Sequence, residues 1–525
     1  METPAVTTPA RRGFFRRLFS WGSARKVLFI LAALVTLGAL FIAEEDWRGS
    51  RAWANYKREM EAKGERFDMA RLIPPKVPDD QNFAMTPLFA PIFDLPPEVL
   101  RQPPKLVTNM VQGQAVVGEE MDANRGRKLE PQLPFPSTPN RFTWQYALAA
   151  DLIAWAKGFE STNSATPPAP ITDPVQAASI VLDGLKPFES TLAELQSASA
   201  RPYCRFNIPY EQWDNPHVGS AWSEHLTLIK RLYQLLTLHA EAEMVAGHSD
   251  LALKDIVVMF RIDDGVKDEP QVLSQLVRIS DITYLLQPIG EGLAEHRLSD
   301  EQLQVLEDRL RKTDLIASTV QALYGERDIC NNPSFDRGYM SPRGWNRLEQ
   351  LNVNRAFQES VFPPFDVAAR VINPSVNHSI DLAFQKSHVI GLGAYLHHRI
   401  MATMTLPVFS KVPQKVAVAQ SGVDLAMVAC ALERYRLALG QYPEELAALI
   451  PRFVTVLPHD IINGQPLKYR RTDNGRFILY SIGWNEKDDS GVIATTKVNI
   501  TGRNLTTTRL DPEQGDWVWQ YPEKP

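Results

Sequence analysis

The sequence has little of what most directly reveals a function. Its 525 residues include three cysteines, which lie too far apart for a disulfide framework or a zinc site: Cys204, Cys330 and Cys430. One disulfide that leaves a single thiol free is compatible with this count. The excess of one charge is small, at a formal net charge of −5, and 44% of the residues are hydrophobic. These values exclude a collagen-like chain, a wholly disordered chain and a wholly basic nucleic-acid binder.

The sequence also lacks the usual catalytic and cofactor motifs. It contains no G-x-S-x-G, P-loop, H-E-x-x-H or dinucleotide fingerprint. Three short groupings of metal-ligand types are present: His239 with Glu243, Glu291 with Glu295 and His296, and His397 with His398. Each grouping lacks further ligands, so each favours a solvated or core-edge role over a metal site. Cys430 has no paired histidine and is expected to be a packing residue.

One long uncharged apolar run is present, at residues 27–43. Its 17 residues can just cross the hydrocarbon core of a bilayer as a helix. The preceding residues 1–26 carry six basic side chains against one acid, whereas residues 44–525 are acidic overall. By the positive-inside rule, this asymmetry predicts a basic cytoplasmic tail (1–26), a transmembrane helix (27–43) and an extracytoplasmic body. We therefore expect a single-pass protein of the bacterial inner membrane, with the lipid bilayer as a partner.

An apolar run of this kind has two alternatives to a membrane anchor, which are a buried core helix and a cleaved signal peptide. A buried core helix would not require a basic flank on one side. A cleaved signal peptide needs small residues at two positions before the cut, and bulky Phe41 stands where one is wanted before Ala43. The pattern favours an uncleaved signal anchor.

The residues after the apolar run predict a stalk, a proline-rich segment and a helical body. Residues 44–73 are expected to form a helical stalk. Residues 74–139 hold 13 of the 39 prolines and predict an extended segment, whose phenylalanines indicate that it packs on the body. Residues 140–422 predict an irregular helical domain, with caps at Asp173, Gly247 and Ser299. One stretch, 240–255, is similar to a tetratricopeptide turn, but no second copy follows at that period, so a repeat array is not expected.

The last segment, 423–525, predicts a small α+β module. Asp424 is expected to cap a helix that ends at Gly440, and Tyr442 to Ile450 to form a short second helix. Alternating residues predict a β-hairpin over 466–482 and a further strand over 516–521. The expected fold is thus mainly α: an N-terminal transmembrane helix, a body of irregular helical hairpins, and a C-terminal helix with an antiparallel β-hairpin.

The motifs of this module carry a resemblance. A helix over 431–437 is followed by Gly-Gln-Tyr-Pro at 440–443, by Gly-Gln-Pro-Leu-Lys-Tyr-Arg at 464–470 and by Tyr-Ser-Ile-Gly at 480–483. Residues 423–490 thereby resemble the globular domain of major pseudopilins of type II secretion systems. They also resemble bacterial single-pass membrane proteins that carry this module at the C-terminus.

The resemblance implies a calcium site. Major pseudopilins bind calcium in a loop that corresponds to 483–491 here, and four residues offer hard oxygen ligands: Asn485, Asp488, Asp489 and Asp516. Calcium takes six to eight oxygens, so carbonyls or water would have to complete the set. A solvated acidic turn is the alternative.

Three functions are consistent with the sequence. The first is a membrane-anchored envelope protein with a non-catalytic structural or interaction role, related to secretion-system pseudopilins, that binds other envelope proteins. The second is a helical periplasmic scaffold or binding module. The third is an envelope hydrolase whose site is assembled from scattered residues, which would require a deep pocket with converging acids or histidines.

Overall fold

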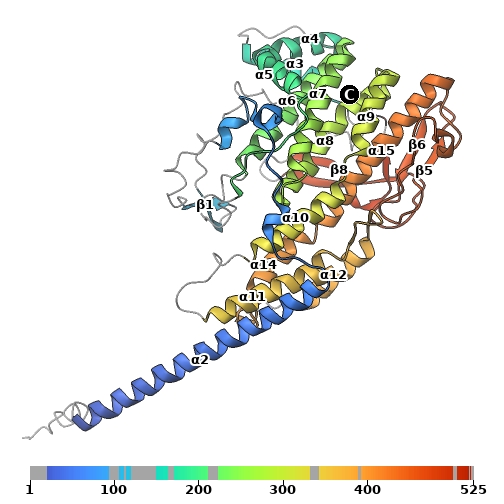
Figure 1. The fold of residues 1–525 in the computed structure, drawn as a ribbon. Helices are drawn as coiled ribbons and strands as arrows, with labels where there is room; N and C mark the ends of the chain where they lie inside the picture. The colour runs from blue at the N-terminus through green and yellow to red at the C-terminus, as the bar shows by residue number, and fades with distance from the viewer. Residues whose placement is uncertain are drawn as a thin grey trace, which may run out of the picture. The chain divides into compact units, whose positions relative to one another are not determined.

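The computed structural model of the chain describes residues 21–93, 106–111, 114–119, 149–163, 171–210, 223–331, 342–387, 392–500, 505–519 and 521. The fold is mainly helical with small antiparallel sheets, in agreement with the expected fold class (Figure 1). It divides into two compact units. The first consists of Met1–Arg66, Phe335–Arg355 and Val389–Thr403, and the second of the remaining residues. The predicted helical domain, 140–422, therefore contributes to both.

The first unit is built on one long helix, α2 (Trp21–Ala62). This helix contains the whole apolar run and continues into the predicted stalk without a break. The stalk helix was predicted to extend to residue 73, which is wrong: α2 ends at Ala62, and only a short 3-10 turn follows at Met69–Leu72. Gly64 adopts a φ of 93°, a left-handed conformation that stops a helix.

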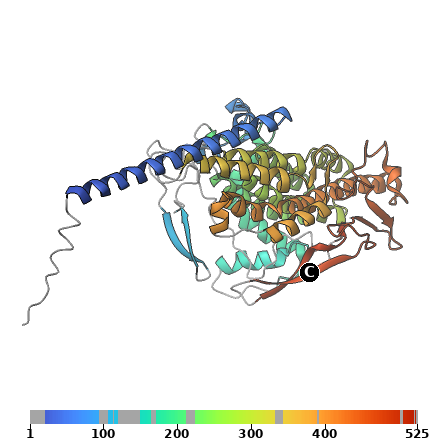
Figure 2. The ribbon, with the colours of Figure 1, turned by 90° about the horizontal axis from the view of Figure 1, so that it is seen from below.

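The second half of α2 packs along α11 (Arg343–Ala356) (Figure 2). Two glycines allow the backbones to meet, because a Cβ on Gly49 would lie 2.0 Å from the carbonyl oxygen of Gly344. Further along the two helices, the guanidinium of Arg355 lies 5.9 Å from the ring centroid of Tyr56. The short helix α13 (Leu392–Leu396) completes the described part of this unit.

The second unit is a stack of helices around α6 and α15. Its helices are α3 (Leu152–Asn163), α4 (Pro174–Leu185), α5 (Glu189–Ala198), α6 (Glu224–Ala246), α7 (Ser249–Val266), α8 (Val272–Ala294), α9 (Asp300–Arg311), α10 (Leu315–Ile329), α12 (Pro374–Ser387) and α15 (Val412–Leu439). Helix α14 (Ile400–Phe409) begins in the first unit and ends in the second. Helix α6 packs against α4, α7 and α8, and α15 packs against α8, α9 and α10.

The local signals predicted from the sequence are confirmed here. Asp173 caps α4 by accepting from two backbone N–H groups, with proline in the first turn. Gly247 ends α6 in a left-handed conformation, and Ser299 with Gln302 forms a complete capping box on α9.

Asp424 is not a helix cap, contrary to the prediction. It lies in the middle of α15 and is buried. The helix begins thirteen residues earlier than expected, at Val412, because the Ala- and Val-rich turns before Asp424 are buried among α8, α9 and α10. The expected boundary at 422/423 therefore falls inside one continuous core helix.

The C-terminal sheet has the predicted hairpin and third strand. Strand β5 (Lys468–Arg471) pairs antiparallel with β6 (Phe477–Ser481), which pairs with β9 (Trp517–Trp519), and this sheet lies against α15 (Figure 1). The predicted second helix from Tyr442 to Ile450 is wrong: only the 3-10 turn Leu446–Leu449 forms.

Three further hairpins were not predicted. They are β1 (Leu106–Val111) with β2 (Gln114–Glu119), β3 (Phe365–Asp366) with β4 (Val371–Ile372), and β7 (Ile493–Ile500) with β8 (Leu505–Gly515).

The first part of the proline-rich segment packs on the helical body, as predicted. It forms 3-10 turns at Asp79–Gln81, Phe83–Met85 and Ala90–Phe93. The rings of Phe83 and Phe89 are fully buried, and Phe89 contacts Phe206 edge-on at 5.3 Å between centroids. The side chain of Asn82 donates to the carbonyl of Arg205 at 2.8 Å. Beyond residue 93, only β1 and β2 of this segment are among the described residues.

Candidate functional site

Helix α6 carries three titratable side chains into the interior of the helical body. His239, Glu241 and Glu243 alternate along one turn, with alanine at 240 and 242. Because α6 is covered by α4, α7 and α8, these groups are held away from solvent: Glu241 is 1% exposed and Glu243 8%. Charged groups at such positions need partners. The partners of these side chains lie on two sides of α6.

On one side, Glu241 meets Glu291 of α8. The two carboxyl groups hydrogen-bond to each other, so they hold a proton between them. Burial raises the pKa of both groups, and for Glu241 the nearby negative charge of Glu291 raises it further. Glu291 accepts from the backbone N–H of Ala150 at 2.7 Å and from the side chain of Gln287 at 2.5 Å. Within the described structure, Oε1 of Glu241 has no hydrogen-bond partner.

The donor arrangement assigns the proton to one member of the pair. Two N–H donors stabilise a charged carboxylate at Glu291, whereas Glu241 is more deeply buried and receives none on Oε1. Glu241 is therefore the protonated partner, and Glu291 the ionised acceptor.

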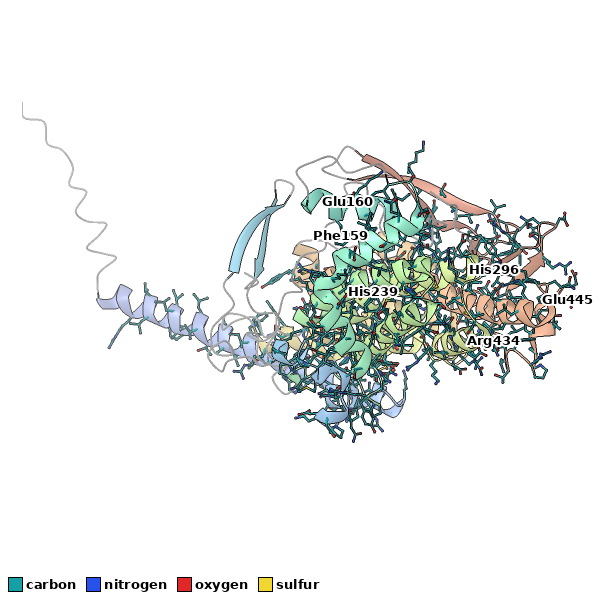
Figure 3. All side chains as sticks on the ribbon, turned by 90° about the horizontal axis from the view of Figure 1, so that it is seen from above. Phe159, Glu160, His239, His296, Arg434 and Glu445 are labelled. Carbon is teal, nitrogen blue, oxygen red and sulfur yellow. The ribbon has the colours of Figure 1, made fainter. Side chains whose placement is uncertain are left out.

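On the other side of α6, five polar side chains form a row of neighbours, which are Gln196, Asp255, His239, Glu243 and the exposed His248 (Figure 3 labels His239). Gln196 donates to Asp255 at 2.7 Å, and Asp255 lies 2.6 Å from Nδ1 of His239. Nε2 of His239 is 3.7 Å from Glu243, which contacts Nδ1 of the exposed His248 at 2.7 Å. Burial opposes a charged imidazole, but the hydrogen bond and charge of Asp255 raise the pKa of His239. Burial raises the pKa of Asp255.

This arrangement can hold and exchange protons. A carboxyl pair that shares one proton and a histidine oriented by an aspartate are both groups used in acid–base chemistry. The described residues contain no group of three or more His, Cys, Asp or Glu side chains that could hold a metal ion. The two residues of the predicted pair, His239 and Glu243, lie close together in the structure. Asp255 orients the imidazole of His239.

The other predicted groupings separate. Nδ1 of His296 contacts Glu433 of α15 at 2.8 Å, while Glu291 turns to Glu241. Glu433 is the centre of this second cluster, since it also accepts from Arg436 at 2.6 Å and from the Tyr442 hydroxyl at 2.7 Å. Figure 3 labels His296 and Arg434 in this region.

The histidine pair 397–398 lies in the first unit. The carbonyls of both residues accept from the side chain of Asn352, at 3.2 and 2.7 Å. The ring of His398 lies 5.2 Å from that of Trp345. Burial lowers the pKa of His398, which favours its neutral form at physiological pH.

The residues of the predicted calcium site are only partly brought together. Asn485 donates to Asp489 at 2.8 Å, and buried Asp516 accepts from the backbone N–H groups of Asp489 and Gly491. Asp488 turns to a different set of partners, which are Lys468 at 3.2 Å and the hydroxyl of Tyr480 at 3.0 Å. Calcium binding in this loop stays a prediction, and it requires Asp488 to leave Lys468.

The three cysteines are free thiols, which contradicts the single-disulfide alternative. Cys330 and Cys430 are buried, and burial raises the pKa of all three thiols, to about 12 at Cys330. Such thiols are poor nucleophiles, in line with a packing role for Cys430.

The sequence reasoning missed Glu241 and Asp255. Glu241 stands between two alanines in a helix with a long leucine stripe, where a buried polar residue needs a partner. Its partner, Glu291, is fifty residues away, and no local pattern joins them. Comparisons with protein families, curated proteins and solved structures find no match for this chain.

Proposed function

We propose that the chain is a membrane-anchored protein of the bacterial envelope, with a structural or interaction role carried out by its extracytoplasmic body. One observation carries the proposal. Among the described residues, two helical segments are long and apolar enough to cross a membrane: the apolar part of α2 is 0% buried, whereas the segment in Ile400–Leu439 is 94% buried. The second is thus accounted for as a core helix, while the first leaves a continuous apolar surface that needs a lipid environment.

The charge distribution supports an orientation. Basic side chains gather before the apolar run and acidic ones after it. This distribution favours an orientation in which the N-terminal side of α2 lies in the cytoplasm and the residues after the apolar run lie outside it. Trp and Phe residues before the run, and Trp47 and Trp53 after it, are typical of interfacial anchors.

The interaction role rests on the pseudopilin-like module and is tested by partner capture. The detergent-solubilised full chain is purified by affinity, with calcium and with chelator, and co-purifying proteins are identified. We expect envelope proteins in the eluate. Recovery of the chain alone under both conditions would contradict the role.

A pair of matched single substitutions tests whether partners bind to the C-terminal module or to the helical body. Deletion of 423–525 is unsuitable because it cuts α15, a core helix. Leu439, 51% exposed at the end of α15, is changed instead to glutamate, with the exposed Leu273 of α8 changed in the same way as control. Loss of partners with Leu439→Glu alone supports binding through the module; loss with Leu273→Glu alone supports the helical scaffold.

A second candidate function, an envelope hydrolase, is motivated by the Glu241–Glu291 pair, which supplies the converging acids but not the deep pocket that this hypothesis requires. The test is turnover of envelope peptide, glycan and ester substrates by the full chain and by its Glu241→Gln variant. Turnover that the substitution abolishes supports catalysis, and equal rates or no turnover contradict it.

A further inference from the structure

We propose that the α13 segment of the first unit rests in the outer headgroup region of the bilayer, beside the point where α2 leaves the hydrocarbon core. This inference rests on the membrane anchoring proposed above. It adds a second, peripheral lipid contact made by Tyr395 and Leu396, with Trp345 as the residue that sets their depth.

The depth of Trp345 follows from its two contacts on α2. Its ring meets Phe41 edge-on, at 6.4 Å between centroids, and its indole N–H donates to Glu45 at 2.8 Å. Phe41 belongs to the apolar run, and Glu45 is the second residue after its end. Trp345 therefore spans the boundary between the apolar and the charged parts of α2. A tryptophan with an apolar body and a satisfied N–H is the residue type that favours this depth.

α13 is held at the same level by Trp345. The ring of Tyr395 lies edge-on to that of Trp345 at 5.7 Å. Tyr395 is 46% exposed and Leu396 62% exposed, while the adjacent Ala394 is buried against the unit. Two large side chains that face outward at the level where the apolar run ends form a surface continuous with it, and lipid is the occupant that this continuity indicates.

Basic side chains on α2 and after α13 suit a phosphate headgroup layer, next to the acidic residues Glu44, Glu45 and Asp46. Arg51 follows Glu45 on α2 and lies over the ring of Trp47 at 5.2 Å. Arg399 follows α13 and is exposed. Long basic side chains close to an apolar surface can place their stems on it and their charges among phosphates.

The test measures the depth of three single spin labels on the full chain in vesicles of phosphatidylethanolamine and phosphatidylglycerol. The labelled variants are Leu396→Cys in α13, Val35→Cys in the apolar run and Leu439→Cys on the second unit, each exposed by half or more. The unsubstituted chain, labelled in the same way, gives the background from native thiols. Collision with oxygen reports lipid, and collision with a water-soluble nickel chelate reports solvent.

We expect the Val35 label to collide mainly with oxygen, the Leu439 label mainly with nickel, and the Leu396 label to be shielded from nickel at a shallower depth than Val35. A Leu396 label as accessible to nickel as that at Leu439, with Val35 still in lipid, would overturn this inference alone. A Val35 label in water would overturn the membrane anchoring as well. Dipolar broadening between Leu396 labels would mean that a second copy of the chain covers the surface, which also overturns the inference.

Discussion

Gly49 of α2 and Gly344 of α11 face each other at a contact that leaves no room for a side chain. A Cβ on Gly49 would lie 2.0 Å from the Gly344 carbonyl oxygen, and one on Gly344 would lie 1.9 Å from the carbonyl oxygen of Glu45. This close approach lies just beyond the apolar run, and it brings Trp345 within reach of both Phe41 and Glu45. The packing of the first unit thus begins where the proposed membrane segment ends.

Gly49→Val should separate α2 from α11, because the atoms that it meets belong to backbone and cannot move aside. Overpacking of this kind costs about 1–3 kcal/mol. We expect faster amide hydrogen exchange in α11, measured on the detergent-solubilised chain. The control is Gly38→Val in the same helix, where an added Cβ meets nothing within 4 Å. Equal exchange in the two variants would contradict the contact.

Asp424 should make the protein less stable as the pH rises. Burial raises its pKa to about 7, although Arg370 at 3.6 Å and Gln420 oppose this. Because the folded state holds this proton more tightly than the unfolded state, stability is lost as the pH rises from about 4 through 7. The expected loss is on the order of 4 kcal/mol.

Denaturant unfolding from pH 4 to pH 8 measures this effect. Asp424→Asn should remove the corresponding slope and be the more stable chain at pH 8. Asp314→Asn, which changes an exposed contact of the same arginine, should retain the slope. A wild-type slope in Asp424→Asn would show that another group is responsible.

Glu433 should have the opposite pH dependence. Burial opposes its charge, but hydrogen bonds from Arg436, Tyr442 and His296 lower its pKa. Its contribution is therefore present above the unfolded-state pKa and is lost as the pH falls. Glu433→Gln should cost about 2 kcal/mol at pH 7. The exposed pair of Glu444 with Arg471 is the control, and Glu444→Gln should cost less than about 0.5 kcal/mol. Similar losses in both variants would rule out a special role for Glu433.

The proton between Glu241 and Glu291 should make their amide variants unequal. Glu241→Gln replaces a protonated donor with an amide donor and should change stability at pH 7 by less than about 0.5 kcal/mol. Glu291→Gln removes the charge that accepts from Ala150 and Gln287 and should cost about 1–2 kcal/mol. Denaturant unfolding of both variants decides this, and the reverse order would assign the proton to Glu291.

Calcium should raise the melting temperature if the loop after β6 binds it as predicted. Lys468 competes for Asp488 in the described conformation, so Lys468→Ala should enlarge the calcium-induced shift. Asp489→Asn should reduce it, because a carboxylate ligand is lost. Melting curves with calcium and with chelator measure these shifts. No shift in any of the three chains would exclude the site.

The elements that the sequence predicted correctly depend on neighbouring residues. The capping box of Ser299 and the left-handed Gly247 are decided within one turn of helix. The hairpin of β5 and β6 is decided by alternation around the turn at Asn474 and Gly475. Local preference and final structure agree at these places, so short-range reasoning was sufficient.

The errors arise where distant contacts decide. Aspartate is a frequent helix-cap residue, but Asp424 lies inside α15. The helix extends beyond it in both directions because α15 is buried against α8, α9 and α10. Glu241 and Glu291 are each ordinary helix residues, and only the packing of α6 on α8 makes them a pair. The strands β7 and β8 are rich in polar residues and lack the apolar alternation that identifies a half-buried strand.

The central claim is that α2 anchors the chain in a membrane. Its most direct test is whether the intact chain, with residues 27–43, stays in the membrane fraction. Membranes from cells that express the protein are extracted with alkaline carbonate, and the intact mass of the chain is measured in the pellet and in the supernatant. Membrane anchoring by α2 predicts a pelleted chain that still contains residues 27–43. A chain that begins after Ala43 and is released into the supernatant would contradict it.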